Sequence, residues 1–358
     1  MTILKQSVGI DISKASFTAC ICSKELDGEL HFTQVKKFKN DKSGFNQLVR
    51  WVRKQCTTKA PTVFLMEATG AYHERLALHL SKLKQTIHVV LPNKSKHYFG
   101  SLNIKSKTDE IDARVLSQFG VERKHKPWQA PSEQLLILRD LTRFHVQLQE
   151  QKTAFNNILE SKLHGHKVED FILKANKKII ATLNKQIESI KKQIKAELAK
   201  DPELEEKVNK VATIKGVGWM TVTTIVAETL GFAQFSSIRQ VTGYAGYDVV
   251  ENQLGTSIKG KTRISKKGNR YIRNAMYFPA MVASRFNPEL KAAYLRIVQR
   301  KPAKMIAQVA IQRKLLALIY TLWKNNSEYI EDYKNKVAST NTAEATLGSS
   351  TGELLSDH

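Results

Sequence analysis

The sequence contains few cysteines, few acidic residues for its number of basic ones, and no long apolar run. Its three cysteines, Cys20, Cys22 and Cys56, are too few for a disulfide framework or a four-cysteine zinc site. The sequence has no uninterrupted stretch of about 18 apolar residues, so no membrane span is predicted. Its N-terminus lacks the apolar segment of a signal peptide. These absences predict a cytoplasmic protein that contacts no membrane.

The charge balance is strongly positive. Among 358 residues, 57 Lys and Arg stand against 33 Asp and Glu, which gives a formal net charge of +24. With 42% hydrophobic and 25% charged residues the chain is expected to be globular, and its length suits two or three domains of roughly 100–200 residues each. The excess charge predicts a polyanionic partner, first of all nucleic acid. The simpler alternative is a soluble basic surface.

The first 130 residues alternate strand-like and helical segments. Their periodicity predicts strands over 7–12, 17–22, 31–38, 63–66 and 87–91 and helices over 43–55, 72–83 and 108–119. Gly28 is expected in a turn, Thr108 at a helix N-cap, and Pro92 at the end of a strand. The order β-β-β-α-β-α-β-α is typical of an RNase H-like domain, so we expect an α/β fold over residues 1–130.

The rest of the chain is predicted to be mainly helical. Within residues 131–210, Leu141, Leu148 and Phe155 fall seven residues apart, and a seam of Ile and Leu over 180–198 steps by three or four residues. Residues 163–166 lie between the two as an expected break. This pattern predicts two long coiled-coil helices that form either an antiparallel arm or a dimerisation element. Residues 211–335 are expected to form a C-terminal domain, and the Ser-, Thr- and Gly-rich residues 336–358 a disordered tail.

Four acidic residues stand where the strands and the last helix of this fold converge. Asp11 lies inside an apolar strand, where an unpaired carboxylate costs several kcal/mol, and Glu67 ends the next buried strand. Asp109 and Asp112 face one side of a helix's first turn, whereas Glu110 points elsewhere. Together the four are predicted to be catalytic and to bind two Mg²⁺ about 4 Å apart for phosphodiester transfer.

Each of these acids also has a simpler interpretation. A strand-end Glu is commonly a surface residue, and Asp at a helix start commonly caps the helix or compensates its dipole. Residues 9–14 also resemble the first phosphate loop of sugar kinases and actin-like ATPases. That family needs a second Asp-containing loop and a Gly-rich adenosine motif, and neither is found. The charge of +24 favours an enzyme of nucleic acid.

Two segments of the C-terminal domain are predicted to hold nucleic acid. Residues 213–227 fit a helix-hairpin-helix, whose glycines bring backbone N–H groups to a phosphate; a plain helix–helix turn is the alternative. Residues 255–273, here called the basic loop, hold seven Lys or Arg, and the alternative there is a solvated basic face. The predicted contacts are Lys215, Gly216, Gly218, Lys259, Lys261, Arg263, Lys266, Lys267, Arg270 and Arg273.

Two hydroxyl residues, Thr256 and Ser257, lie among the cations of the basic loop. A serine in such surroundings attacks a phosphodiester if a base takes its proton, because the cations stabilise the pentacovalent charge. Most serines in basic loops only donate a hydrogen bond to phosphate. Chemistry alone therefore leaves a nucleophile and a phosphate ligand as two possible roles.

Six motifs together resemble one family, the DEDD insertion-sequence transposases, which are related to the pilin-gene DNA invertase and, more distantly, to Holliday-junction resolvases. The resemblance runs from about residue 7 to 323. It is carried by residues 9–14 (GIDISK), 66–73 (MEATGAYH), 107–114 (KTDEIDAR), 214–218 (IKGVG), 244–247 (YAGY) and 263–269 (RISKKGN).

The resemblance implies a resolvase-like N-terminal domain whose Asp11, Glu67, Asp109 and Asp112 bind Mg²⁺, a coiled coil used for assembly, and a C-terminal transposase domain with a catalytic serine. It further implies recombination of donor and target DNA by a homo-oligomer, a dimer or tetramer, guided by a structured RNA. The family's serine precedes the glycine that is Gly255 here, where this chain has Leu254. The role then passes to Ser257, which we take as the candidate, or to Thr256, or this copy is impaired.

The sequence thus predicts an Mg²⁺-dependent DNA transposase. Two alternatives stay open, a structure-selective junction nuclease that leaves free DNA ends and a non-catalytic nucleic-acid-binding scaffold.

Overall fold

The computed structural model describes residues 2–56, 60–68, 70–166, 168–251, 253–254, 258–260, 262–301 and 303–331. Contacts divide the chain into two compact units, Met1–Ala130 and Pro131–His358. The tail predicted over residues 336–358 lies outside the described residues.

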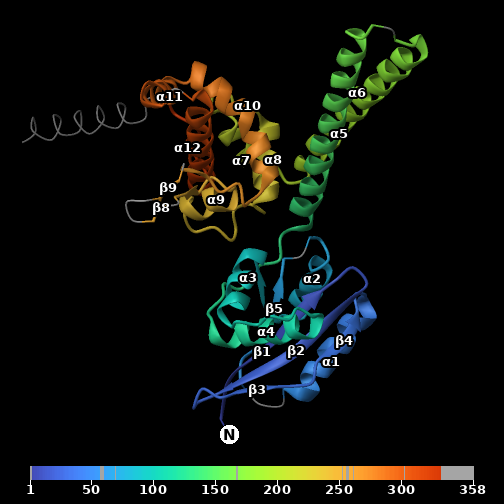
Figure 1. Ribbon diagram of the computed structural model, residues 1–358, viewed down its shortest axis with the longest axis vertical. Helices are drawn as coiled ribbons and strands as arrows, with labels where there is room; N and C mark the ends of the chain where they lie inside the picture. The colour runs from blue at the N-terminus through green and yellow to red at the C-terminus, as the bar shows by residue number, and fades with distance from the viewer. Residues whose placement is uncertain are drawn as a thin grey trace, which may run out of the picture. The chain divides into compact units, whose positions relative to one another are not determined.

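The first unit is built on one mixed sheet of six strands (Figure 1). The strands are β1 (Ile3–Ile12), β2 (Ser16–Glu25), β3 (Leu30–Phe32), β4 (Lys36–Lys39), β5 (Thr62–Glu67) and β6 (Thr86–Val90). Their order is β3-β2-β1-β5-β6, with β4 also paired to β2. β1 is antiparallel to β2 and parallel to β5, and β5 is parallel to β6. An antiparallel meander continued by parallel strands confirms the RNase H-like expectation.

One strand expectation was wrong in detail. The strand predicted over 31–38 is split into β3 and β4, which pair with different parts of β2. Between them, the Thr33 hydroxyl accepts a hydrogen bond from the Ile21 N–H at 3.1 Å. A side chain therefore takes the backbone donor that a continuous ladder would use, and the ladder is interrupted.

Four helices cover the sheet in two layers. They are α1 (Lys42–Gln55), α2 (Glu74–Lys82), α3 (Pro92–Ser101) and α4 (Asp109–Glu122). Val8, Ile10 and Ile12 of β1 are buried with α1 and α2, so by alternation Gly9 and Asp11 belong to the opposite face, where α4 packs. Helix α3 was not predicted. Pro92 ends the strand as expected, but it also begins this helix, at a position where proline is favoured.

The second unit begins with a hairpin of two long helices, α5 (Glu133–Leu163) and α6 (Asp170–Leu198). Leu148 on α5 packs against Leu183 and Ile187 on α6. The interruption predicted at 163–166 falls at the turn between them. The structure therefore confirms the antiparallel arm, formed within one chain.

The remaining helices of the second unit surround a separate core. They are α7 (Pro202–Val211), α8 (Trp219–Glu228), α9 (Ile238–Tyr244), α10 (Arg270–Phe286), α11 (Pro288–Arg300) and α12 (Lys304–Asn325). By length and composition α12 resembles a membrane span, but half of its most apolar window is buried inside the unit. Ile311, Leu315 and Ile319 have no exposed surface. Helix α12 is therefore the core helix of this unit.

Candidate active site

Two of the predicted acids lie at neighbouring strand ends in the first unit. In the parallel ladder of β1 and β5, Ile10 pairs with Met66. The residues that follow, Asp11 and Glu67, therefore come side by side at the carboxyl ends of these strands, where parallel α/β sheets commonly place their functional groups.

Helix α4 brings the other two acids to the same sheet face. The Thr108 hydroxyl accepts from the Ile111 N–H at 3.2 Å and caps the helix as predicted, and Asp109 and Asp112 lie in the first turn. A Cβ on Gly9 would collide with the α4 backbone from Ala113 to Ser117. The missing side chain of Gly9 thus sets how closely the helix approaches β1.

Burial and neighbouring carboxylates raise the pKa of two of the four acids, Asp11 and Asp112. The pKa of Asp11 is raised to about 6, first by burial and then by the carboxylates of Asp112, Asp109 and Glu67, against the opposing charge of Lys107. Burial also raises the pKa of Asp112, with Glu67 and Asp109 adding to the effect while Lys107 opposes it. The four acids therefore share one local environment of concentrated negative potential.

The chemistry of this group fits a hard divalent cation. Carboxylate oxygens are the ligands that Mg²⁺ prefers, and Oδ1 of Asp112 is buried without a hydrogen-bond partner. Over the described ranges, however, no three His, Cys, Asp or Glu residues lie close enough together to hold a metal ion. The four-residue metal site accordingly stays a prediction.

Ser95 is a residue of this site that the sequence did not reveal. Its hydroxyl donates to Oε2 of Glu67 at 2.6 Å, and the serine is 1% exposed. It lies on α3, the helix that was not predicted, so no local pattern linked it to Glu67. Recognising Pro92 as a helix start would have placed it one turn into that helix.

Helices α7 and α8 and the turn between them lie where the helix-hairpin-helix was predicted. Gly216 adopts a φ of +91°, which favours glycine, and Gly218 is the N-cap of α8. Lys215, predicted to bind phosphate, instead lies 3.0 Å from a carboxylate oxygen of Glu331. The turn has the expected geometry, but its lysine already has an anionic partner.

Two short ladders connect the residues just before the basic loop with residues inside it. β7 (Val249–Val250) pairs with β10 (Arg263–Ile264), and β8 (Gln253–Leu254) pairs with β9 (Ile258–Lys259). The predicted contacts Arg263, Lys266, Lys267 and Arg270 are exposed. Thr256, Ser257, Lys261 and the side chain of Lys259 lie outside the described residues.

One cation of the basic loop has a structural role. Arg273 is partly buried, and its Nη1 donates to the Ala245 carbonyl at 2.8 Å. This guanidinium therefore holds together two segments of the second unit. Among the exposed cations nearby, Arg270 lies 3.9 Å from a carboxylate oxygen of Glu150, and contact of Arg263, Lys266 and Lys267 with a phosphate backbone stays a prediction.

Comparison with known proteins bears on both units. Residues 8–168 match a transposase profile of the DEDD IS110 type, and residues 208–295 match the transposase profile of the IS116/IS110/IS902 family. The pilin gene-inverting proteins of Moraxella lacunata and Moraxella bovis are each 26% identical to this chain over 327 residues, which is 91% of this chain and 98% of theirs.

Among solved structures, RuvC of Thermus thermophilus matches 34% of this chain and 99% of its own, with 11% identity and a TM-score of 0.27. The same protein bound to a Holliday junction substrate matches equal shares, with a TM-score of 0.26.

The two profile matches include the residues assembled above. The first contains Asp11, Glu67, Asp109 and Asp112, and the second contains the hairpin glycines and the basic loop. The chain belongs to the IS110 family of DEDD transposases.

Proposed function

We propose that this transposase cuts and rejoins DNA with an Mg²⁺-binding acidic group in its first unit and a serine of the basic loop in its second. The observation that carries the proposal is the placement of Asp11 and Glu67 at adjacent strand ends, with the raised pKa of Asp11 and of Asp112, to which the neighbouring carboxylates of Glu67 and Asp109 contribute. So much negative potential in one place suits a cation far better than a structural role.

In the proposed mechanism Asp11, Glu67, Asp109 and Asp112 hold the metal. Bound Mg²⁺ supplies Lewis-acid stabilisation of a phosphoryl oxygen. In the sequence, Ser257 lies between β8 and β9, in the basic loop that also contains Arg263 and Lys266. Attack by its hydroxyl oxygen forms an O–P bond and breaks one DNA ester bond, and the leaving oxygen takes up the proton that the serine loses. The cations of Arg263 and Lys266 stabilise the negative charge that develops on the non-bridging phosphate oxygens.

Two further features of the proposal come from the family resemblance, namely a guide RNA and a homo-oligomer. The net charge of +24 supports binding of more than one nucleic-acid strand. On the coiled-coil arm, Phe144, Ile158 and Ile179 are 46%, 44% and 39% exposed. Apolar residues exposed on a two-helix arm support pairing with the arm of a second copy, in a dimer or tetramer. The expected location is the cytoplasm.

A denaturing gel tests the proposed chemistry. The full chain is incubated with DNA that carries an element end, Mg²⁺ and the transcript of the flank. We expect a covalent protein–DNA adduct, and Ser257→Ala is expected to lower its yield at least about tenfold. An adduct that persists in Ser257→Ala and disappears in Thr256→Ala assigns the nucleophile to Thr256.

The same gel separates the alternatives. Cut DNA with free ends and no adduct would favour the junction nuclease, and neither cut nor adduct would favour the scaffold.

Replacing Ser95 with Ala is expected to slow DNA cleavage about tenfold. The hydroxyl gives the Glu67 carboxylate a short, buried hydrogen bond, and losing such a bond to a charged group costs about 1.5 kcal/mol. The rate of Mg²⁺-dependent cleavage measures the effect. Ser101→Ala is the matched control, since its hydroxyl donates to the Tyr98 carbonyl on the same helix. Equal rates in both variants would show that Ser95 does not orient Glu67.

A further inference from the structure

A fully buried carboxylate, Glu228, lies in the second unit apart from the acidic group. It is the last residue of α8, and its side chain has no exposed surface. The carboxyl end of a helix carries partial negative charge, and burial removes the water that would solvate an anion. A carboxylate persists in such a place only if its neighbours satisfy it.

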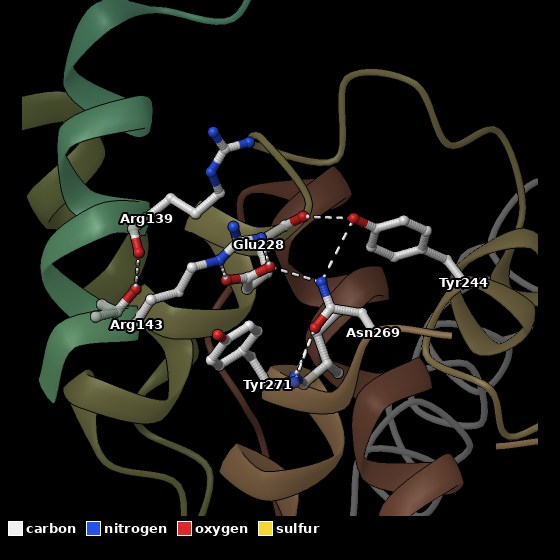
Figure 2. Close-up of polar contacts among 8 residues, drawn as sticks. Arg139, Arg143, Glu228, Tyr244, Asn269 and Tyr271 are labelled. Atoms are coloured by element: carbon white, nitrogen blue, oxygen red, sulfur yellow. Dashed lines mark hydrogen bonds and ion pairs between the residues drawn. The ribbon is translucent and has the colours of Figure 1, made fainter. Parts of the chain in front are cut away.

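Three donated hydrogen bonds satisfy Glu228 (Figure 2). Arg143 of α5 donates from Nε to Oε1 at 2.6 Å and from Nη2 to Oε2 at 2.8 Å. Asn269 donates from Nδ2 to Oε2 at 2.6 Å. The two-pronged arginine contact fixes the carboxylate plane as well as its position. Buried ion pairs add little net stability over apolar packing, and in some proteins they instead fix a geometry; the two-pronged contact here is consistent with such a role.

Asn269 connects this carboxylate to the basic loop. Its Oδ1 accepts from the N–H groups of Tyr271 and Ile272 at 2.9 and 3.2 Å and caps α10. Because the oxygen is used by the cap, only the amide nitrogen faces Glu228. Both polar atoms of the Asn269 side chain, Oδ1 and Nδ2, are therefore held by hydrogen bonds.

The backbone around Asn269 forms the base of the basic loop. Its N–H donates to the Tyr244 carbonyl at 2.8 Å, and the Lys266 N–H donates to the Gly246 carbonyl at 3.1 Å. A Cβ on Gly268 would collide with the backbone of residues 244–246. Residues 244–248 and 263–269 are thus clamped together, and the ladders that flank Thr256 and Ser257 extend from this clamp.

We propose that Glu228 is a positioning residue for recombination: its buried carboxylate joins Arg143 of the coiled-coil arm to Asn269 and so fixes the base of the basic loop against α5. A second contact also joins α5 to the start of α10. The guanidinium of Arg143 lies 4.9 Å from the ring centre of Tyr271, whose N–H is capped by Asn269. The assignment rests on the proposed role of the basic loop in the chemistry.

An exchange of donor and acceptor tests this role. Glu228→Gln removes the charge that Arg143 needs, and Asn269→Asp sets two carboxylates at the distance of the present hydrogen bond. In the double variant, the new amide at position 228 donates to the new carboxylate at position 269. That carboxylate still caps α10, and one negative charge remains near Arg143. A geometric role predicts loss in each single variant and recovery in the double.

The full chain is assayed for the rate of DNA cleavage, for DNA affinity, and for hydrogen exchange at residues 265–269. Each single variant is expected to cleave about 100-fold more slowly, with affinity within about threefold, because a displacement of about 1 Å has an effect of that size on a reaction. Exchange at residues 265–269 is expected to accelerate about tenfold. The double variant should return to within about fivefold of the parent rate. Glu188→Gln, which removes an exposed ion pair with Lys191 on α6, should stay within about twofold.

Three results would overturn the proposal: a parent-like rate in Glu228→Gln, a double variant no faster than the slower single one, or affinity lost in proportion to rate. If a single variant does not fold, the double variant decides, since only restored geometry recovers both folding and rate. Hydrogen exchange reports on the base of the basic loop whether or not Ser257 is the nucleophile. Recovery of slow exchange in the double variant, with an adduct that Ser257→Ala leaves intact, would therefore uphold Glu228 and reject Ser257.

Discussion

Replacing Asp11 with Asn is expected to lower the rate of Mg²⁺-dependent DNA cleavage by a factor of about 1,000 or more. Asp11 is the acid on which the other three carboxylates act, so it lies at the centre of the proposed metal site. An amide of the same shape supplies no negative charge to a cation. Loss of metal-assisted charge stabilisation, which contributes several kcal/mol, accounts for an effect of that size. Cleavage of DNA with an element end, measured over a range of Mg²⁺ concentrations, provides the rate.

The same substitution is expected to stabilise the metal-free protein near neutral pH. The pKa of Asp11 is raised in the folded state to about 6, so its contribution to stability is present below its unfolded pKa and is lost as pH rises through about 6. The amide that replaces the carboxyl group carries no charge at either pH. After allowance for solvent screening, we expect a gain of about 1 kcal/mol at pH 7 and none near pH 3.5.

Glu110→Gln is the matched control for Asp11→Asn. Glu110 lies in the same first turn of α4 but is exposed and contributes nothing to the pKa of Asp11. Its cleavage rate is expected to stay within about twofold of the parent. Cleavage that survives in Asp11→Asn, or falls equally in Glu110→Gln, would refute the acidic site.

Gly9→Ala is expected to destabilise the first unit by about 3 kcal/mol or more. The added Cβ would meet backbone atoms of α4, which cannot move aside as a flexible side chain can. For a unit of this size that lowers the melting temperature by about 12 °C. The helix would also shift away from β1 and carry Asp109 and Asp112 away from Asp11, so cleavage should fall further than the loss of folded protein explains.

Calorimetry of the full chain, with hydrogen exchange of β1 to identify the transition, measures this effect. Gly100→Ala is the control, because Gly100 lies in α3 of the same unit and an added Cβ there meets nothing within 4 Å. That variant is expected to gain about 0.5–1 kcal/mol, as alanine is the better helix former. An unchanged transition in Gly9→Ala would show that α4 does not need close contact with β1.

Local patterns were sufficient for most elements of the first unit. The alternation of apolar residues predicted β1, β2, β5 and β6, and Thr108 marked the start of α4, because periodicity and capping act over a few residues. The split of the strand predicted over 31–38 was missed, since the hydroxyl that interrupts it bonds a residue 12 positions away. Helix α3 was missed because Pro92 was interpreted only as the end of the preceding strand and not also as the start of a helix.

In the candidate site, too, the residues with a local sequence signal were predicted, and the contacts between residues distant in sequence were not. Asp11, Glu67, Asp109 and Asp112 stood out because a carboxylate in an apolar strand, or a pair at a helix start, is visible in a short window. The partners of those acids were not visible. Ser95 meets Glu67, and Arg143 meets Glu228 across 85 positions of sequence, only through packing.

By itself the sequence determined the α/β and helical organisation and the family, and it singled out the four acids as candidates, because those depend on composition, periodicity and motifs that neighbouring residues carry. The tertiary structure alone decided which groups meet. In the folded chain Lys215 forms an ion pair with Glu331, and Arg273 donates a hydrogen bond to the Ala245 carbonyl. Glu228 is buried between the coiled-coil arm and the basic loop. Charge and hydrogen bonding act through space, so a surplus of cations in sequence becomes a surface for nucleic acid only after the folded chain has used some of them for its own contacts.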